Sequence, residues 1–149
     1  LCDAAGLQLI PTFVAFTPWT TLDGYRDFLA EIARLDLIER VAPIQYAIRL
    51  LIPAGSRLLE LPAVQELVLP FDAAALAYPW RHPDPRMDEL QARVTVIAEN
   101  AAASSPRTAF SAIERLAYGL ANRPVPAPQP GRPRRIRPTP PRLTEDWFC

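Results

Sequence analysis

The chain has 149 residues, half of them apolar, and a formal net charge of zero at pH 7. This length and apolar content suit one domain with its own core. The neutral total argues against charge-driven binding of nucleic acid or of an anionic membrane. No apolar run reaches the roughly 20 residues that cross a bilayer, and no basic segment precedes the first apolar run as in a signal peptide. We therefore expect a cytoplasmic protein whose partners include neither nucleic acid nor membrane.

The two cysteines, Cys2 and Cys149, stand near opposite ends of the sequence and make a poor disulfide framework. A reducing cytosol would keep both as free thiols. With His82, the single histidine, they are too few and too far apart for zinc, which needs about four ligands at short spacings. For His82 we expect either a hydrogen bond with the backbone or a general acid–base role.

The first predicted elements in chain order are a helix end and a strand. Residues 1–6 are typical of a helix end, and Gly6 stands where a C-terminal cap belongs. Residues 7–16 are rich in apolar, β-branched and aromatic side chains and predict a buried strand. Because Pro11 lacks a backbone N–H, this strand should lie at a sheet edge or carry a bulge.

A helix is predicted over residues 22–36, with Thr20 or Thr21 as its N-cap. Three- and four-residue steps give this helix one apolar face, which consists of Tyr25, Phe28, Leu29, Ile32 and Leu35. A second strand is predicted over residues 41–52. Strand, helix and strand in this order favour a parallel βαβ unit with a right-handed crossover.

Gln45 and Arg49 stand four residues apart in the second predicted strand, so both side chains should point the same way. Polar side chains that face an interior need partners. Two interpretations stay open: the pair binds a ligand, or Gln45 is satisfied by backbone while Arg49 reaches solvent at the strand end.

Helices dominate the next part of the sequence. Residues 53–56 predict a tight turn, and short helices should follow near residues 62–69 and 72–77. Residues 78–85 form a proline-rich connector.

The connector ends in Asp84 and Pro85, the N-cap and first residue of a longer helix that reaches about Ala103. Ser105 and Pro106 repeat this start signal for another helix. We expect the apolar faces of both helices to belong to the core rather than to a partner groove.

The composition changes at Arg123. Residues 124–141 hold eight prolines and no acidic residue, so we expect polyproline II structure or disorder there. Arg135, Pro138 and Pro141 have the spacing of a polyproline ligand motif, although a linker is the simpler interpretation. Residues 143–149, Leu-Thr-Glu-Asp-Trp-Phe-Cys, are instead acidic and aromatic.

Several of these stretches resemble radical SAM enzymes. Residues 16–21, Phe-Thr-Pro-Trp-Thr-Thr, stand where the fifth strand of that superfamily's partial barrel meets a Gly-x-Pro-Gly-Glu-Thr-like loop. Residues 53–56, Pro-Ala-Gly-Ser, stand where the sixth strand ends in a Pro-Gly-Thr-like turn. Residues 78–85 and 143–149 resemble more closely the CUAEP/CCAEP-tail radical SAM proteins and selenoproteins of high-GC bacteria, whose chains end in Cys-Sec-Ala-Glu-Pro or Cys-Cys-Ala-Glu-Pro.

The resemblance covers nearly all of the chain and implies an α/β fold. Residues 1–61 would form the last strand–helix–strand part of a partial (βα)6 barrel, residues 62–122 a helical extension, and residues 123–149 a disordered Pro/Arg-rich tail. The missing N-terminal part of the same barrel would be the partner. The complete enzyme would cleave S-adenosylmethionine reductively and abstract hydrogen from an unknown small-molecule or peptide substrate.

The cofactors implied are S-adenosylmethionine and a [4Fe–4S] cluster held by a Cys-x3-Cys-x2-Cys motif. The chain lacks this motif, so we expect it to retain neither cofactor and to be inactive alone. Cys149 would adjoin selenocysteine or cysteine in a complete family member and form a redox pair, which makes it a candidate catalytic residue. A UGA selenocysteine codon directly after Cys149, interpreted as a stop, would end the chain there.

By the same resemblance, Thr17, Trp19, Gln45 and Arg49 would line the adenosyl or substrate pocket, because ligands bind at the C-terminal ends of parallel strands. Arg49 would pair with a carboxylate, Gln45 would hydrogen-bond adenosine or substrate, and Trp19 would stack on a ring or pack as a hydrophobic lid. The alternative function is a non-catalytic α/β interaction module with a proline-rich, partner-binding tail.

Overall fold

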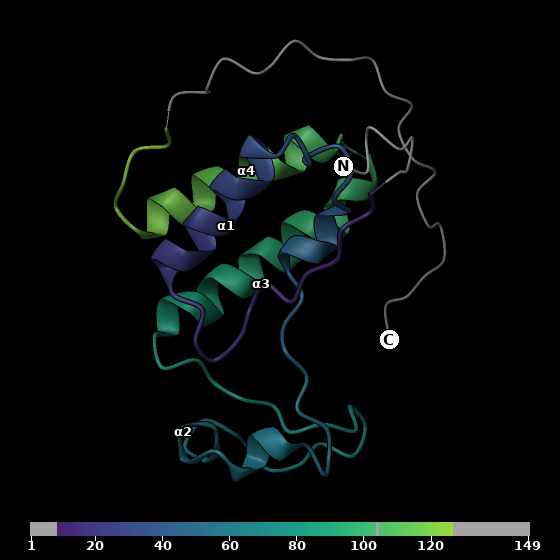
Figure 1. Ribbon diagram of the computed structural model, residues 1–149, viewed down its shortest axis with the longest axis vertical. Coiled ribbons are helices and arrows are strands. Elements are labelled where there is room, and N and C mark those ends of the chain that lie inside the picture. Colours follow the sequence, from purple (N-terminus) through teal and green to yellow (C-terminus); the bar gives the residue numbers. More distant parts are fainter. Residues whose placement is uncertain (1–8, 104, 127–149) are drawn as a thin grey trace.

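The computed structural model describes residues 9–103 and 105–126. Of these described residues, 50% are helical and 6% pair as strand. Three longer helices gather at one end of the molecule, and the short helix α2 lies in the loops of the other end (Figure 1). The elements are α1 (Leu22–Arg34), η2 (Pro43–Tyr46), η3 (Arg57–Glu60), α2 (Pro62–Gln65), α3 (Pro85–Glu99), η4 (Asn100–Ala103) and α4 (Pro106–Leu120).

The predicted α/β fold is wrong. The described residues contain no sheet and no part of a barrel, and neither predicted strand forms. The two extended segments that flank α1 meet at a single parallel bridge, between Phe16 and Arg49. There the backbone N–H of Phe16 donates to the carbonyl of Ile48 over 3.0 Å, and the N–H of Leu50 donates to the carbonyl of Phe16 over 2.8 Å.

Local hydrogen bonds explain why this pairing does not extend into a ladder. Pro43 opens the 3-10 turn η2, in which the N–H of Gln45 donates to the carbonyl of Ala42 over 2.9 Å. The side-chain Oε1 of Gln45 accepts the N–H of Phe13 over 2.9 Å. Both segments thus use backbone donors that a ladder would need, and Pro11 has no donor to offer.

The predicted starts of the three long helices are confirmed. Thr21, Asp84 and Ser105 are the N-caps of α1, α3 and α4, and each side chain accepts an N–H from the first turn. Pro85 and Pro106 occupy the first helical positions, where a missing N–H costs nothing. The helix predicted as far as Ala103 continues after α3 as the 3-10 turn η4.

The two short helices predicted between residues 62 and 77 are only partly present. The first is the four-residue α2, after which Val68 pairs with Trp80 in an antiparallel bridge. The second does not form, because Asp72 pairs with Ala77 and its Oδ1 accepts the N–H of Ala74 over 2.8 Å. An Asp side chain that bonds two residues ahead favours a turn over a helix.

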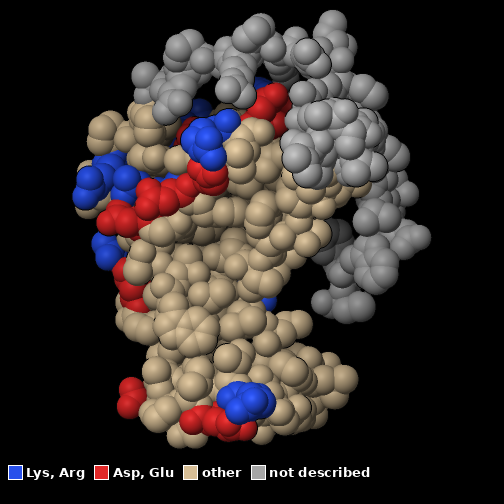
Figure 2. Space-filling model, viewed as in Figure 1, with Lys and Arg blue, Asp and Glu red and all other residues tan. Residues whose placement is uncertain are grey.

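The main core lies where α1, α3, α4 and η2 meet. Its largest fully buried side chains are Phe16, Tyr25, Leu29, Val41, Tyr46, Met87, Leu90, Val94 and Ile113. A smaller second cluster consists of Ile52, Val64 and Trp80. Charged side chains gather over α1, whereas the segment around α2 carries few (Figure 2). The predictions for residues 1–6, the Pro/Arg tail beyond residue 126 and Cys149 lie outside the described residues.

Candidate functional site

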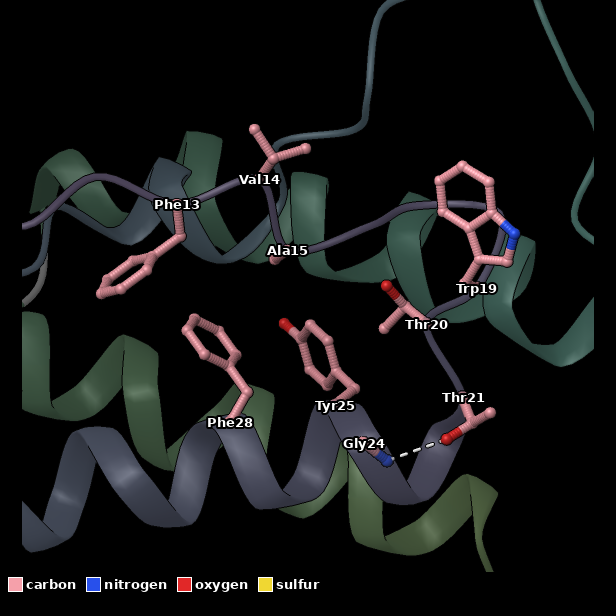
Figure 3. A pocket seen from close by; sticks show the side chains of 9 residues that line it. All are labelled: Phe13, Val14, Ala15, Trp19, Thr20, Thr21, Gly24, Tyr25 and Phe28. Carbon is pink, nitrogen blue, oxygen red and sulfur yellow. Dashed lines mark hydrogen bonds between the residues drawn. The ribbon is translucent and has the colours of Figure 1, made fainter. Parts of the chain in front are cut away.

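A hollow of about 360 Å³ lies between the segment that leads into α1 and the first turns of that helix. Figure 3 shows Phe13 pointing toward Phe28 and Val14 pointing away from α1. The ring centroids of Phe13 and Phe28 are 5.0 Å apart in an edge-to-face arrangement, which is favourable for aromatic pairs. The lining residues are Phe13, Val14, Ala15, Trp19, Thr20, Thr21, Gly24, Tyr25 and Phe28.

The polar groups around this hollow are already engaged within the chain. The hydroxyls of Thr17 and Thr20 share a hydrogen bond of 2.9 Å, and the Thr20 hydroxyl also accepts the Thr17 N–H. Thr21 Oγ1 accepts the N–H of Gly24 over 3.0 Å. These bonds fix the loop that enters α1, so the two predicted capping threonines have structural partners.

Tyr25 closes the floor of the hollow. Its hydroxyl donates to the backbone carbonyl of Tyr46 over 2.8 Å, which joins α1 to η2. Two causes raise the pKa of Tyr25 far above its ordinary value: burial, which is the larger, and the neighbouring Tyr46. Tyr25 therefore stays a neutral hydrogen-bond donor near neutral pH.

Trp19 is the exposed aromatic residue of this loop. More than half of its surface is accessible, and the indole stands at the rim of the hollow rather than over its centre (Figure 3). The accessible indole of Trp19 therefore leaves room for a ring to stack on it.

Arg49 is the centre of a group of polar and aromatic contacts. Its Nη1 donates to Asp88 Oδ1 over 2.7 Å, its Nη2 donates to the carbonyl of Trp80 over 2.6 Å, and its guanidinium lies 3.6 Å from the centroid of the Trp80 ring. The Trp80 indole N–H donates to the carbonyl of Leu50 over 2.8 Å. The second oxygen of Asp88 accepts the N–H of His82 over 3.0 Å. We call Arg49, Trp80 and Asp88 the arginine clamp.

The clamp joins three parts of the chain that are distant in sequence. Arg49 follows η2, Trp80 belongs to the connector before α3, and Asp88 lies in the first turn of α3. The Asp88 carboxylate neutralises the guanidinium and the Trp80 ring covers one of its faces. This geometry makes the clamp a structural link between the two ends of the molecule.

His82 takes part in the turn that starts α3. Its Nδ1 accepts the N–H of Asp84 over 2.9 Å, and its Nε2 is buried without a partner among the described residues. Arg86 binds the Asp84 carboxylate through its side chain, which lowers the pKa of Asp84. The backbone hydrogen bond expected for His82 is thus present.

The structure does not bring the four predicted pocket residues into one site. Thr17 and Trp19 share the loop at the hollow, Gln45 bonds the backbone of Phe13, and Arg49 belongs to the clamp. The partner of Arg49, Asp88, stands 39 residues away in the sequence and carries no local signal of that pairing. The sequence pattern places Trp80 in the connector and does not indicate its contact with Arg49.

The residues present do not fit the cofactors that the resemblance implies. The described residues include no cysteine and no group of three side chains able to hold a metal ion. Because the threonine and tyrosine groups of the hollow are internally bonded, they leave few partners for the polar parts of S-adenosylmethionine.

None of the described helices has the length and apolar character needed to cross a bilayer. Comparison with models of protein families, with curated proteins and with solved structures found no match to this chain.

Proposed function

We propose that this chain is the C-terminal part of a radical SAM enzyme. In that enzyme it would line one side of the substrate pocket and pack against the preceding segment, and it would not form the cofactor-binding centre. The proposal rests on the resemblance of its loop and terminal motifs, not on a shared fold. Radical chemistry in the complete enzyme would require a [4Fe–4S] cluster and S-adenosylmethionine. The segment that precedes this chain would hold both cofactors.

One structural observation supports the proposal: the extended segment before α1 has an exposed apolar edge. Leu9, Ile10 and Val14 are exposed there, next to the single parallel bridge at Phe16. Exposed apolar side chains beside an extended segment with few backbone partners favour coverage by another chain segment. The preceding part of a longer enzyme is the occupant that the resemblance supplies.

The loop after this edge gives the chain its proposed contact with substrate. Thr17 and Thr20 hold the loop through their shared hydrogen bond, and Trp19 stands exposed beside the hollow. A segment packed along Leu9 to Val14 would lie close to Trp19 and would narrow the hollow. Trp19 would then contribute an aromatic face to a pocket whose polar groups come from the preceding segment.

Genomic DNA provides the first test. Translation in the same frame upstream of Leu1 should give a Cys-x3-Cys-x2-Cys motif, and translation beyond Cys149 should give a UGA codon followed by Ala-Glu-Pro. A stop codon directly upstream with unrelated sequence before it would refute the proposal.

The exposed edge provides the second test, in the protein extended by its upstream sequence. Val14→Asp should lower the unfolding temperature of the extended protein and leave that of the 149-residue chain nearly unchanged, because Val14 is covered only in the former. Leu35→Asp is the matched control, since the exposed fractions of Val14 and Leu35 are 50% and 48%. An equal effect of Val14→Asp in both proteins would contradict coverage of this edge.

A further inference from the structure

A groove of about 640 Å³ lies between α3 and α4. Its floor is apolar and its rim carries two arginines, Arg93 on α3 and Arg115 on α4. The floor consists of Ala92, Val96, Ile97, Ala112 and Leu116. We call this feature the α3–α4 groove.

The apolar floor is a second apolar surface of α3. This helix already buries Met87, Leu90 and Val94 in the core. Val96 nevertheless remains 56% exposed, in a helix whose opposite side is fully packed. Burial of both faces is favourable for a helix that is apolar on two faces. We therefore expect another segment to cover the floor of the groove.

The rim sets the charge of that occupant. Arg93 pairs with Glu89 over 3.0 Å, but both side chains are more than half exposed, so this pair is weak. Arg115 forms no ion pair or hydrogen bond with the described residues. An apolar floor between two arginines is complementary to a segment that combines carboxylates with large apolar side chains.

We propose that residues 143–149 of the same chain bind in the α3–α4 groove. Trp147 and Phe148 cover the apolar floor, while Glu145 and Asp146 pair with Arg93 and Arg115 at the rim. This inference does not depend on the proposed function.

The other segments outside the described residues fit the groove poorly. Residues 1–8 contain one acidic residue, Asp3, and no aromatic side chain. Residues 127–142 contain only arginines as charged residues, and the rim would repel them. Residues 143–149 alone join acidic and aromatic side chains.

The chain is long enough for this contact. Residues 127–142 would span about 50 Å at about 3 Å per residue. The groove residues Ala112 and Leu116 lie about 6 to 12 Å along the helix axis from the end of α4 at Leu120. A tethered segment has an effective concentration in the millimolar range, so even a weak contact becomes well populated.

The experiment places a nitroxide label on Cys149 of the full chain that carries Cys2→Ser. Amide signals of Val96 and Leu116 should lose most of their intensity, and the loss should disappear when the nitroxide is reduced. Arg93→Glu/Arg115→Glu should restore most of the intensity, and so should Glu145→Arg/Asp146→Arg. Combining all four changes should bring the broadening back, because the charges are again complementary.

Two controls keep the result interpretable. Arg57→Glu makes a similar change in η3, at a side chain that is 91% exposed, and it should leave the broadening intact. Trp147→Ser/Phe148→Ser in the unlabelled chain should shift the amide signals of Val96 and Leu116, which tests the contact without a label. Undiminished signals in the labelled chain would overturn the proposal. So would broadening that arises only when labelled and isotope-enriched chains are mixed, because the occupant would then be a second copy.

Discussion

Replacement of Arg49 by alanine tests the arginine clamp. The change removes the hydrogen bonds to Asp88 and to the Trp80 carbonyl, as well as the contact with the Trp80 ring. A hydrogen bond of a charged group contributes about 1.5–3 kcal/mol, and the ring contact adds about 0.5–1 kcal/mol. The side chains of Arg49 and Asp88 are 22% and 34% exposed, so solvent screening favours the low end of these ranges.

We therefore expect Arg49→Ala to lower the free energy of unfolding by about 2–4 kcal/mol. Urea denaturation followed by circular dichroism measures this change, with an unchanged m-value as the sign that the unfolded state is the same. Arg57→Ala is the matched control: its partner Glu60 is 3.7 Å away on the surface, and we expect a loss below about 0.5 kcal/mol. Equal, small losses for both variants would refute the structural role of the clamp.

Arg49→Lys separates charge from geometry. Lysine keeps the positive charge but cannot bond Asp88 and the Trp80 carbonyl with a planar fork or stack on the ring in the same way. A free energy of unfolding between those of the wild-type chain and Arg49→Ala would support the clamp geometry. A free energy equal to that of the wild-type chain would mean that charge alone matters.

Four further variants test other parts of the fold by the same denaturation assay. Tyr25→Phe should cost about 1–2 kcal/mol because the buried Tyr46 carbonyl loses its donor, whereas Tyr46→Phe should be neutral or stabilising because the buried Tyr46 hydroxyl has no partner among the described residues; the reverse order would contradict these contacts. Asp84→Ala should cost about 1 kcal/mol by removing the cap of α3. Because the pKa of Asp84 is lowered in the folded chain, that difference should be present near pH 7 and shrink as the pH falls below about 4; a difference independent of pH would argue against ionised Asp84. Burial raises the pKa of Glu114, so its ionisation opposes folding and stability falls as the pH rises through that pKa; Glu114→Gln should stabilise the chain at pH 7 but not near pH 3, and no gain at pH 7 would refute this.

Local chemistry made the helix starts predictable. Asp84 with Pro85 and Ser105 with Pro106 provide a cap and a fixed backbone angle within two residues, so no distant contact is needed to specify them. The strands were not predictable in this way. Apolar, β-branched sequence is equally typical of an extended segment outside a sheet, and whether it joins a ladder depends on bonds such as that from the Phe13 N–H to Gln45.

The contacts of the predicted site residues also depend on the tertiary structure. Thr17 and Trp19 lie in the loop between the extended segment and α1, and their role in binding a ligand stays a prediction. The alternation that placed Gln45 and Arg49 on one face failed because Gln45 lies within the 3-10 turn η2 and not in extended backbone. Asp88 could not be identified as the partner of Arg49, since long-range ion pairs leave no spacing in the sequence.

The most direct test of the account is the iron content and S-adenosylmethionine binding of two proteins after anaerobic reconstitution. The 149-residue chain should take up no stoichiometric cluster and bind no S-adenosylmethionine, because its two cysteines are too few for a [4Fe–4S] site. The protein extended by its upstream sequence should take up about four irons per chain and bind S-adenosylmethionine. Cluster uptake by the 149-residue chain, or none by the extended protein, would contradict the proposed function.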